Sequence, residues 1–327
     1  MSRLFALLFA FFTCSALFAN DLVVYSGRSE ALVAPLFAQF TKETGIKVDV
    51  RYNSTASIAT QFLNEQKNSP ADVIFLQESG YLTMLSKANL LVSLKSELRD
   101  QVDEHLQDTY GYWLGSSARV RVLAYNTDKV KVEDLPKDLK ELTDPKWLKQ
   151  IGWAPSNASM QAHVSALRVL WGEEPTFKWL EGVKANQPLS FQKNAQIAQA
   201  VGQGELLLGW SNHYYTHQLK KQNPNLKVAN YHFPESGKAG NILIISGVGI
   251  NKHSKNIPQA EKLVNFLVGP YAQNYFANES FEYPTRRGMA ANPALTPLNK
   301  IPFADVTQQQ LADIEPTVTM LRKLGLL

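Results

Sequence analysis

Two adjacent tyrosines, Tyr214 and Tyr215, are the residues of this sequence best suited to hold a ligand. They belong to the polar run 212–217, which follows the apolar run 206–210. This pattern predicts a strand, a turn and the start of a helix. At a helix N-terminus both side chains can lean toward one point beyond the first turn, and the exposed N–H groups there favour an anion, hence a tyrosinate. From spacing alone, the favoured interpretation is instead two aromatic residues that pack across a lobe.

Two histidines flank the pair. His213 and His217 have the i, i+4 spacing of half a zinc motif, but no Glu follows His213 and the sequence offers no third ligand. Solvated or core histidines are therefore the favoured interpretation. The sequence also contains no phosphate-binding loop of the Walker type and no serine in a nucleophile elbow, so a hydrolase has no positive support.

A possible anion ligand follows the first apolar run of the chain. Arg28 lies in Gly27-Arg28-Ser29, directly after a predicted strand. Loops at the carboxyl ends of parallel strands face the ligand crevice in α/β folds. The planar guanidinium of Arg28 could clamp an anion there, and the alternative is an ordinary surface arginine.

The elements that must position these residues alternate between two periodicities. Short apolar runs at 22–25, 46–50 and 73–76 are separated by helical patterns, and a second alternating region begins at Ile151. Such alternation predicts an α/β fold with a largely parallel sheet. A helix is expected behind a Ser156 or Asn157 cap.

Two further strand-like runs, 120–125 and 242–245, lie between the two alternating regions. They are placed where the chain would pass from one lobe to the other and back. The sequence therefore predicts two interleaved lobes: an N-terminal lobe of residues 20–119 plus 245–296, and a C-terminal lobe of residues 120–244 plus 297–327.

Length and composition exclude several classes of protein. The chain has 327 residues, of which 45% are hydrophobic, with 33 basic and 29 acidic residues and a net charge of +4. This charge is too small and too dispersed to indicate a nucleic-acid partner. The single cysteine, Cys14, excludes intramolecular disulfides and Cys-based zinc sites. A monomer is the default expectation.

The N-terminus resembles a secretory signal peptide. Arg3 precedes an apolar stretch at 4–12, and small residues follow before Ala19. The apolar stretch is shorter than the roughly 20 residues of a transmembrane anchor. We predict a signal peptide at 1–19, with cleavage after Ala16 as the alternative, and export to the periplasm as a soluble protein without cysteine.

Several short motifs, taken in order, resemble those of the periplasmic ferric-ion-binding proteins, the solute receptors of bacterial iron ABC importers. The resemblance covers essentially the whole mature chain, and its specificity comes from the order and spacing of the motifs. The motifs are Val24-Tyr25-Ser26-Gly27-Arg28, Thr44-Gly45-Ile46-Lys47-Val48, Ser69-Pro70-Ala71-Asp72-Val73, Arg119-Val120-Arg121-Val122-Leu123-Ala124-Tyr125-Asn126, Asp144-Pro145-Lys146-Trp147, Ile151-Gly152-Trp153, Asn212-His213-Tyr214-Tyr215 and Glu282-Tyr283-Pro284.

The resemblance implies a two-lobed periplasmic binding protein fold, type II-like, with the ligand in the cleft between lobes and two hinge-crossing strands. It implies that Tyr214 and Tyr215 bind Fe³⁺, a hard ion suited to phenolate oxygen. It also implies a non-enzymatic role: capture of ferric iron and its delivery to an inner-membrane ABC permease. Binding must expel two phenolic protons, so the affinity should fall with acidification.

Two phenolates leave the ferric centre positively charged, and the resemblance implies that a synergistic small anion, carbonate or bicarbonate, completes the site. Arg28 matches the position of an anion-clamping arginine in one branch of the family. The other residues expected around the anion or in the cleft are Tyr25, Ser29, Gln77, Arg119, Asn157, Ala158, Ser159, Asn194 and Asn212.

The sequence departs from the family at three positions. Ser29 and Gln77 stand where some relatives have His and Glu ligands, and Asn157 stands where others have a third tyrosine. We therefore expect anion and water to fill the remaining coordination positions, with Tyr25 or His213 as the alternative ligands.

Two other functions compete with this interpretation. One is a receptor for a different small anion, which would bind oxyanions equally well without iron. The other is a secreted metal-dependent enzyme that uses Tyr214, Tyr215 and His213, which would need a base or nucleophile beside the metal and would show turnover.

Overall fold

The computed structural model describes residues 21–235 and 239–327 of the chain. The signal peptide predicted at 1–19 lies outside the described residues. Within the described ranges, none of the helices has the length and apolar character needed to cross a membrane.

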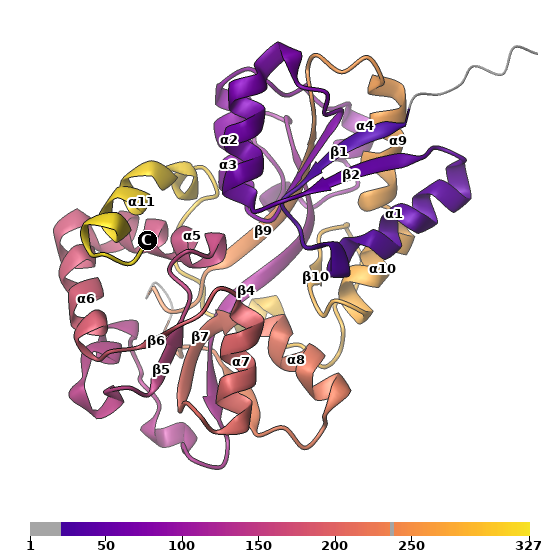
Figure 1. Ribbon diagram of the computed structural model, residues 1–327. Helices are drawn as coiled ribbons and strands as arrows, with labels where there is room; N and C mark the ends of the chain where they lie inside the picture. Colours follow the sequence, from indigo (N-terminus) through magenta and orange to yellow (C-terminus); the bar gives the residue numbers. More distant parts are fainter. Residues whose placement is uncertain (1–20, 236–238) are drawn as a thin grey trace, which may run out of the picture.

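The first lobe is built on a parallel three-stranded unit. Strand β1 (Leu22–Ser26) lies between β2 (Val48–Tyr52) and β3 (Val73–Leu76), with helix α1 (Glu30–Thr44) connecting β1 to β2 and α2 (Thr55–Glu65) connecting β2 to β3 (Figure 1). The predicted strands at 22–25, 46–50 and 73–76 are confirmed to within two residues.

Helix α1 shows why this part of the chain folds as predicted. Its buried residues Val33, Leu36, Phe37 and Phe40 have helical i, i+3, i+4, i+7 spacing and belong to the core of the first lobe. Gly45 ends the helix with φ at 72°, a left-handed conformation that costs little only for glycine, so that the chain can turn toward β2.

Two long strands join the lobes, as predicted. The first half of β4 (Leu114–Asn126) pairs with β9 (Leu243–Ile250) and its second half pairs with β7 (Leu208–Asn212), all antiparallel. β9 then pairs with β3, so one sheet runs through both lobes in the order β2-β1-β3-β9-β4-β7-β5-β6. In Figure 1, β4 and β9 occupy the passage between the upper and the lower body.

The second lobe repeats the α/β arrangement. Its strands β5 (Ile151–Trp153), β6 (Leu189–Ser190) and β7 are mutually parallel, and β8 (Val228–Tyr231) pairs with the end of β4. The helices of this lobe are α5 (Ala158–Trp171), α6 (Glu173–Ala185), α7 (Asn194–Gln203) and α8 (His213–Gln222). The α/β class predicted from the alternation of periodicities is therefore confirmed.

The buried side chains fall into two main clusters that meet on the crossing strands. The cluster of the first lobe extends along β4 to Val122 and includes Ile245, whereas that of the second lobe begins at Leu123. Leu295 and Ile301 both pack in the first cluster, although the predicted boundary at 296/297 assigns Ile301 to the C-terminal lobe. The chain therefore still contributes to the core of the first lobe beyond this boundary.

The remaining elements complete the two bodies. Helices α9 and α10 return to the first lobe, and α11 packs on α5 of the second lobe. Their bounds, with those of the other short elements used below, are α3 (Ser79–Lys87), α4 (Ser96–Arg99), α9 (Ile257–Leu267), α10 (Pro270–Asn278), β10 (Tyr283–Pro284) and α11 (Ile314–Lys323).

Candidate metal centre

The two tyrosines lie in the first turn of α8, immediately after β7 ends at Asn212. Their ring centroids are 4.1 Å apart, with the ring planes at 38°. Tyr214 is buried, with 1% of its surface exposed, and Tyr215 is partly exposed. The strand, turn and helix start predicted at 206–217 are confirmed, and the two neighbouring side chains lie together.

The surroundings of both phenols oppose their ionisation. Burial raises the pKa of Tyr214 well above 10, and the neighbouring Tyr215 and Glu282 add to the effect, while Arg119 and Arg28 oppose it. Burial also raises the pKa of Tyr215, against a hydrogen bond with Tyr214 and the charges of Arg119 and Arg28. A bound cation would have to supply the stabilisation that drives both protons off.

A buried network of ion pairs lies beside the tyrosines. Arg28 donates to both carboxylate oxygens of Glu282, at 3.0 Å from Nη1 and 2.6 Å from Nη2. Arg119 donates to Glu78 at 2.8 Å. Ser246 Oγ accepts from both arginines and so joins the two pairs. Each of these two guanidinium groups therefore has a carboxylate of its own.

This geometry corrects the expectation for Arg28. The fork that was expected to clamp an exogenous anion is occupied by Glu282, and the buried Nε of Arg28 has no partner within residues 21–235 and 239–327. Glu282 was visible in the sequence only as part of a motif, Glu282-Tyr283-Pro284, and its pairing across 254 positions had no local signal. An anion that used the fork would have to displace this carboxylate.

A third arginine, which the sequence analysis did not single out, has no such partner. Arg121 is fully buried and donates to Asn212 Oδ1 at 3.0 Å, to Asn194 Oδ1 at 3.2 Å and to the Trp210 carbonyl at 3.0 Å. Burial, followed by the charge of Arg119, lowers its pKa to about 9. Among the described residues no carboxylate forms an ion pair with it. The second lobe thus holds a buried cation without a counter-charge beside the tyrosines.

The starts of three helices meet at the same place. Asn157 precedes α5 and accepts from the Ser159 N–H at 3.0 Å, while Asn194 begins α7 and donates to Asn157 Oδ1 at 3.0 Å. Asn212 precedes α8 and donates to Ser159 Oγ at 3.3 Å. Ala158, the first residue of α5, is partly exposed. The structure therefore brings together the predicted residues of the second lobe at the N-termini of three helices, a setting that favours anions.

The first lobe reaches this cluster through the loop after β3. Gln77 Nε2 donates to Ser159 Oγ at 3.2 Å, and Ser159 Oγ donates to Glu78 Oε1 at 3.0 Å. The two lobes are thus in contact across the cleft. Gln77, one of the residues expected around the anion or in the cleft, contacts Ser159 at the start of α5.

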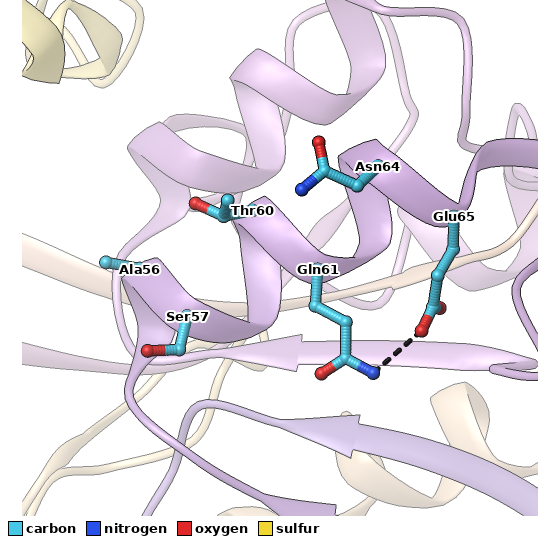
Figure 2. A pocket seen from close by; sticks show the side chains of 6 residues that line it. All are labelled: Ala56, Ser57, Thr60, Gln61, Asn64 and Glu65. Carbon is cyan, nitrogen blue, oxygen red and sulfur yellow. Dashed lines mark hydrogen bonds between the residues drawn. The ribbon is translucent and has the colours of Figure 1, made fainter.

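Tyr25 does not join the site. Its hydroxyl donates to the carboxylate of Glu65 at 3.0 Å and accepts from Gln61 at 3.0 Å. Glu65 and Gln61 belong to α2 and line the open hollow of Figure 2. Because successive side chains of a strand point to opposite faces, the place of Tyr25 on β1 directs it to α2. The alternative of Tyr25 as a metal ligand is therefore not supported by its geometry.

His213 is also engaged elsewhere. Its Nδ1 accepts from the Val120 N–H at 3.1 Å, and its Nε2 donates to the Phe281 carbonyl at 2.8 Å. Both ring nitrogens are used, so His213 is a buried neutral histidine rather than a ligand. Ser29 is exposed and precedes α1. Over residues 21–235 and 239–327, no group of three His, Cys, Asp or Glu side chains is arranged to hold a metal ion.

Two hollows elsewhere on the protein are not lined by any of the residues predicted for the metal or anion site. One of about 560 Å³ lies along α2 (Figure 2), and another of about 580 Å³ lies between α6 and α11. The first is lined by a single helix and is open to solvent, so it does not enclose a ligand. The chemistry of the tyrosines and arginines, rather than the volume of a hollow, defines the candidate site.

Known proteins similar to this chain are bacterial solute-binding proteins, several of which are named for binding ferric iron. Residues 68–311 match a family of bacterial extracellular solute-binding proteins. The chain is 32% identical to the Fe(3+)-binding periplasmic protein of Serratia marcescens, over 98% of this chain and 95% of that protein. It is 30% identical to the major ferric iron-binding protein of Neisseria meningitidis serogroup A, over 98% of each. The structure of iron-bound HitA from Pseudomonas aeruginosa superposes with a TM-score of 0.89, at 33% identity, covering 93% of this chain and 99% of HitA.

Proposed function

This chain belongs to the family of periplasmic ferric-iron-binding proteins, solute-binding proteins of ABC importers, and we propose that it holds Fe³⁺ through the phenolate oxygens of Tyr214 and Tyr215. Proteins of this family bind and hand over a solute and are not enzymes. The ion is cargo, and an inner-membrane ABC permease receives it.

The observation that carries the proposal is the tyrosine pair itself. The two side chains lie together at the start of α8, one buried and one partly exposed, within the influence of Arg28 and Arg119. Phenolate is a hard anionic donor and ferric iron is a hard ion. Two phenols placed together in this way can bind one trivalent cation, which supplies the stabilisation needed to ionise both.

An exogenous anion is the second part of the proposal. Two phenolates leave the ferric centre with positive charge, and Arg121 adds a buried cation without a carboxylate partner among the described residues. The cluster formed by Asn157, Ser159 and Asn212 offers helical N–H groups close by. We assign carbonate or bicarbonate to this position, with water in the remaining coordination sites. Arg28, which is paired with Glu282, contributes through its charge.

Release would follow from opening of the cleft. β4 and β9 are the two crossings between the lobes, and a hinge there would separate Gln77 and Glu78 from Ser159. Opening would expose the tyrosines and the anion to water and thereby weaken both interactions. The site of this exchange is the periplasm, at the permease.

One other function has a specific observation in its favour. Arg121 and the three helix starts would suit a receptor that binds a small anion without iron. Such a receptor would bind bicarbonate or phosphate with the same affinity whether or not iron is present.

The test is a titration of the iron-stripped mature protein with a ferric chelate, with and without bicarbonate, followed by visible absorbance. We expect a tyrosinate-to-iron band that saturates at one equivalent, strengthens with bicarbonate and is lost in Tyr214→Phe and in Tyr215→Phe. Tyr110→Phe, at an exposed tyrosine, is the matched control and should keep the band. A parent protein without any band would contradict the ferric assignment and favour the anion receptor.

A further inference from the structure

A second, smaller cavity lies on the other side of the helix that carries the tyrosines. Its volume is about 170 Å³, and it is enclosed by α8, by β8 with the residue that follows it, and by the chain from β10 to Thr296. Liquid water occupies about 30 Å³ per molecule, so the cavity has room for an oxyanion of four or five heavy atoms. Of the residues considered for the iron and anion sites, His213 lines it, and both ring nitrogens of His213 are bonded to backbone groups.

The wall formed by α8 is one face of that helix. His213, Thr216, His217 and Lys220 follow the i, i+3, i+4, i+7 spacing and all line the cavity. Tyr214 and Tyr215 do not belong to this face of α8; they form the candidate metal centre instead. A single helix of ten residues thus presents different side chains to two separate spaces.

Three of the residues that line the cavity each carry one buried polar atom that has no hydrogen-bond partner in the described part of the chain. These atoms are Thr216 Oγ1, Asn230 Oδ1 and His232 Nδ1. The Asn230 amide is fixed in orientation because its Nδ2 donates to the His213 carbonyl at 2.8 Å, which leaves Oδ1 as the unpartnered end. Buried polar atoms in folded proteins nearly always have a partner, so three around one cavity indicate a polar occupant.

The charge of the cavity is positive. Lys220 forms no ion pair with a described carboxylate, and the described residues that line the cavity include neither Asp nor Glu. Burial, with a smaller contribution from His217, lowers the pKa of His232 to about 4. The His232 imidazole is therefore neutral near pH 7 and can still donate one N–H.

We propose that this cavity binds a small oxyanion that carries a proton, of the class of hydrogen phosphate. Lys220, Thr216 and His232 supply an ammonium, a hydroxyl and an imidazole N–H to its oxygens. Asn230 Oδ1 can only accept, so it selects a ligand with an O–H group over a fully deprotonated one such as sulfate. This site is separate from the tyrosine cleft and does not depend on iron binding there.

The first experiment measures inorganic phosphate binding to the iron-free mature protein by calorimetry, with sulfate as the comparison. Lys220→Gln and Thr216→Val each remove one donor, and we expect each to weaken phosphate binding by about tenfold or more. Lys221→Gln is the matched control, because it removes the same charge one residue away, where Lys221 pairs with Glu279 at 2.7 Å outside the cavity. The control should stay within about twofold of the parent, and sulfate should bind several-fold more weakly than phosphate.

A crystal grown with phosphate gives the second measurement. We expect tetrahedral density between Lys220 and Thr216, retained in the Tyr214→Phe, Tyr215→Phe double variant, whose cleft has lost its phenols. A cavity that holds only water at saturating phosphate would overturn the proposal. So would equal phosphate affinities of Lys220→Gln and Lys221→Gln, both verified as folded by thermal unfolding. Either result leaves the ferric titration unaffected, since that titration reports a tyrosinate band.

Discussion

Arg121 and Asn212 face each other across the junction of β4 and β7, where their backbones are paired and the arginine donates to Asn212 Oδ1 at 3.0 Å. Asn212 is the last residue before the helix that carries the tyrosine pair. The crossing strand is thus connected to the start of α8 by a buried cation. Through Arg121 and Asn212, the crossing strand β4 is therefore linked to both the proposed anion site and the proposed iron ligands.

Replacing Arg121 should weaken the anion-dependent part of iron binding. In Arg121→Gln the buried positive charge is lost, while an amide remains to bond Asn212. We expect the bicarbonate concentration that half-maximally enhances the ferric band to rise by about tenfold, because a charged donor is replaced by a neutral one. Arg51→Gln, at an exposed arginine, should leave this concentration unchanged. Identical bicarbonate curves for the two variants would refute a role of Arg121 in holding the anion.

Breaking the Arg28–Glu282 pair should destabilise the iron-free protein. Glu282→Gln leaves Arg28 buried without a counter-charge, and loss of one partner of a buried ion pair costs about 3–5 kcal/mol. Urea unfolding measures the free energy of unfolding. Lys221→Gln breaks an exposed pair with Glu279 and should cost less than about 1 kcal/mol. We further expect bicarbonate to stabilise Glu282→Gln more than the parent, because a neutral amide with one acceptor oxygen competes less for the Arg28 guanidinium than the carboxylate does. Equal stabilisation would show that the fork does not accept the anion.

Tyr25 should be dispensable for iron. In Tyr25→Phe the ring is kept and only the hydroxyl that bonds Glu65 and Gln61 is removed. We expect the ferric band to keep its intensity and wavelength, and the free energy of unfolding to fall by about 1–2 kcal/mol. A band that shifts or disappears would restore Tyr25 to the ligand set and contradict the placement of its side chain.

Acid should destabilise the protein through His163. This buried histidine accepts from the Trp210 indole N–H at 2.9 Å and bonds the Ala239 carbonyl through its other nitrogen, and burial with the charge of Arg121 lowers its pKa to about 3. In the unfolded chain a histidine has a pKa of about 6.5, so between these values only the unfolded state takes up the proton. The stabilisation is complete above pH 6.5 and is lost as the pH falls toward 3.

Urea unfolding at several pH values between 7 and 4 measures this effect. His163→Gln should flatten the dependence of the unfolding free energy on pH over that interval. His105→Gln is the control, because His105 is largely exposed and should contribute little. Parallel curves for parent and His163→Gln would assign the acid sensitivity to other groups.

The local pattern of residues predicted most of the fold correctly. The apolar runs of β1, β2 and β3, the helical spacing in α1 and the two crossing strands all follow from side chains within a few positions of one another. The adjacency of Tyr214 and Tyr215 is covalent, and their position at a helix start follows from the run that precedes them. These features depend on neighbours in the chain, so the sequence contains them directly.

The partners of the site residues were decided by the tertiary structure. Arg28 meets Glu282 only because β10 returns to pair with β4, and Tyr25 meets Glu65 because α2 packs beside β1. The same assembly occupies both nitrogens of His213 and gives Arg121 no ion pair with any carboxylate that the structure describes. Ion pairs and hydrogen bonds between residues far apart in the chain depend on the order of strands in the sheet and on which groups lose their water. The sequence alone determined which chemistry is present, and the packed structure decided which groups remain free to use it.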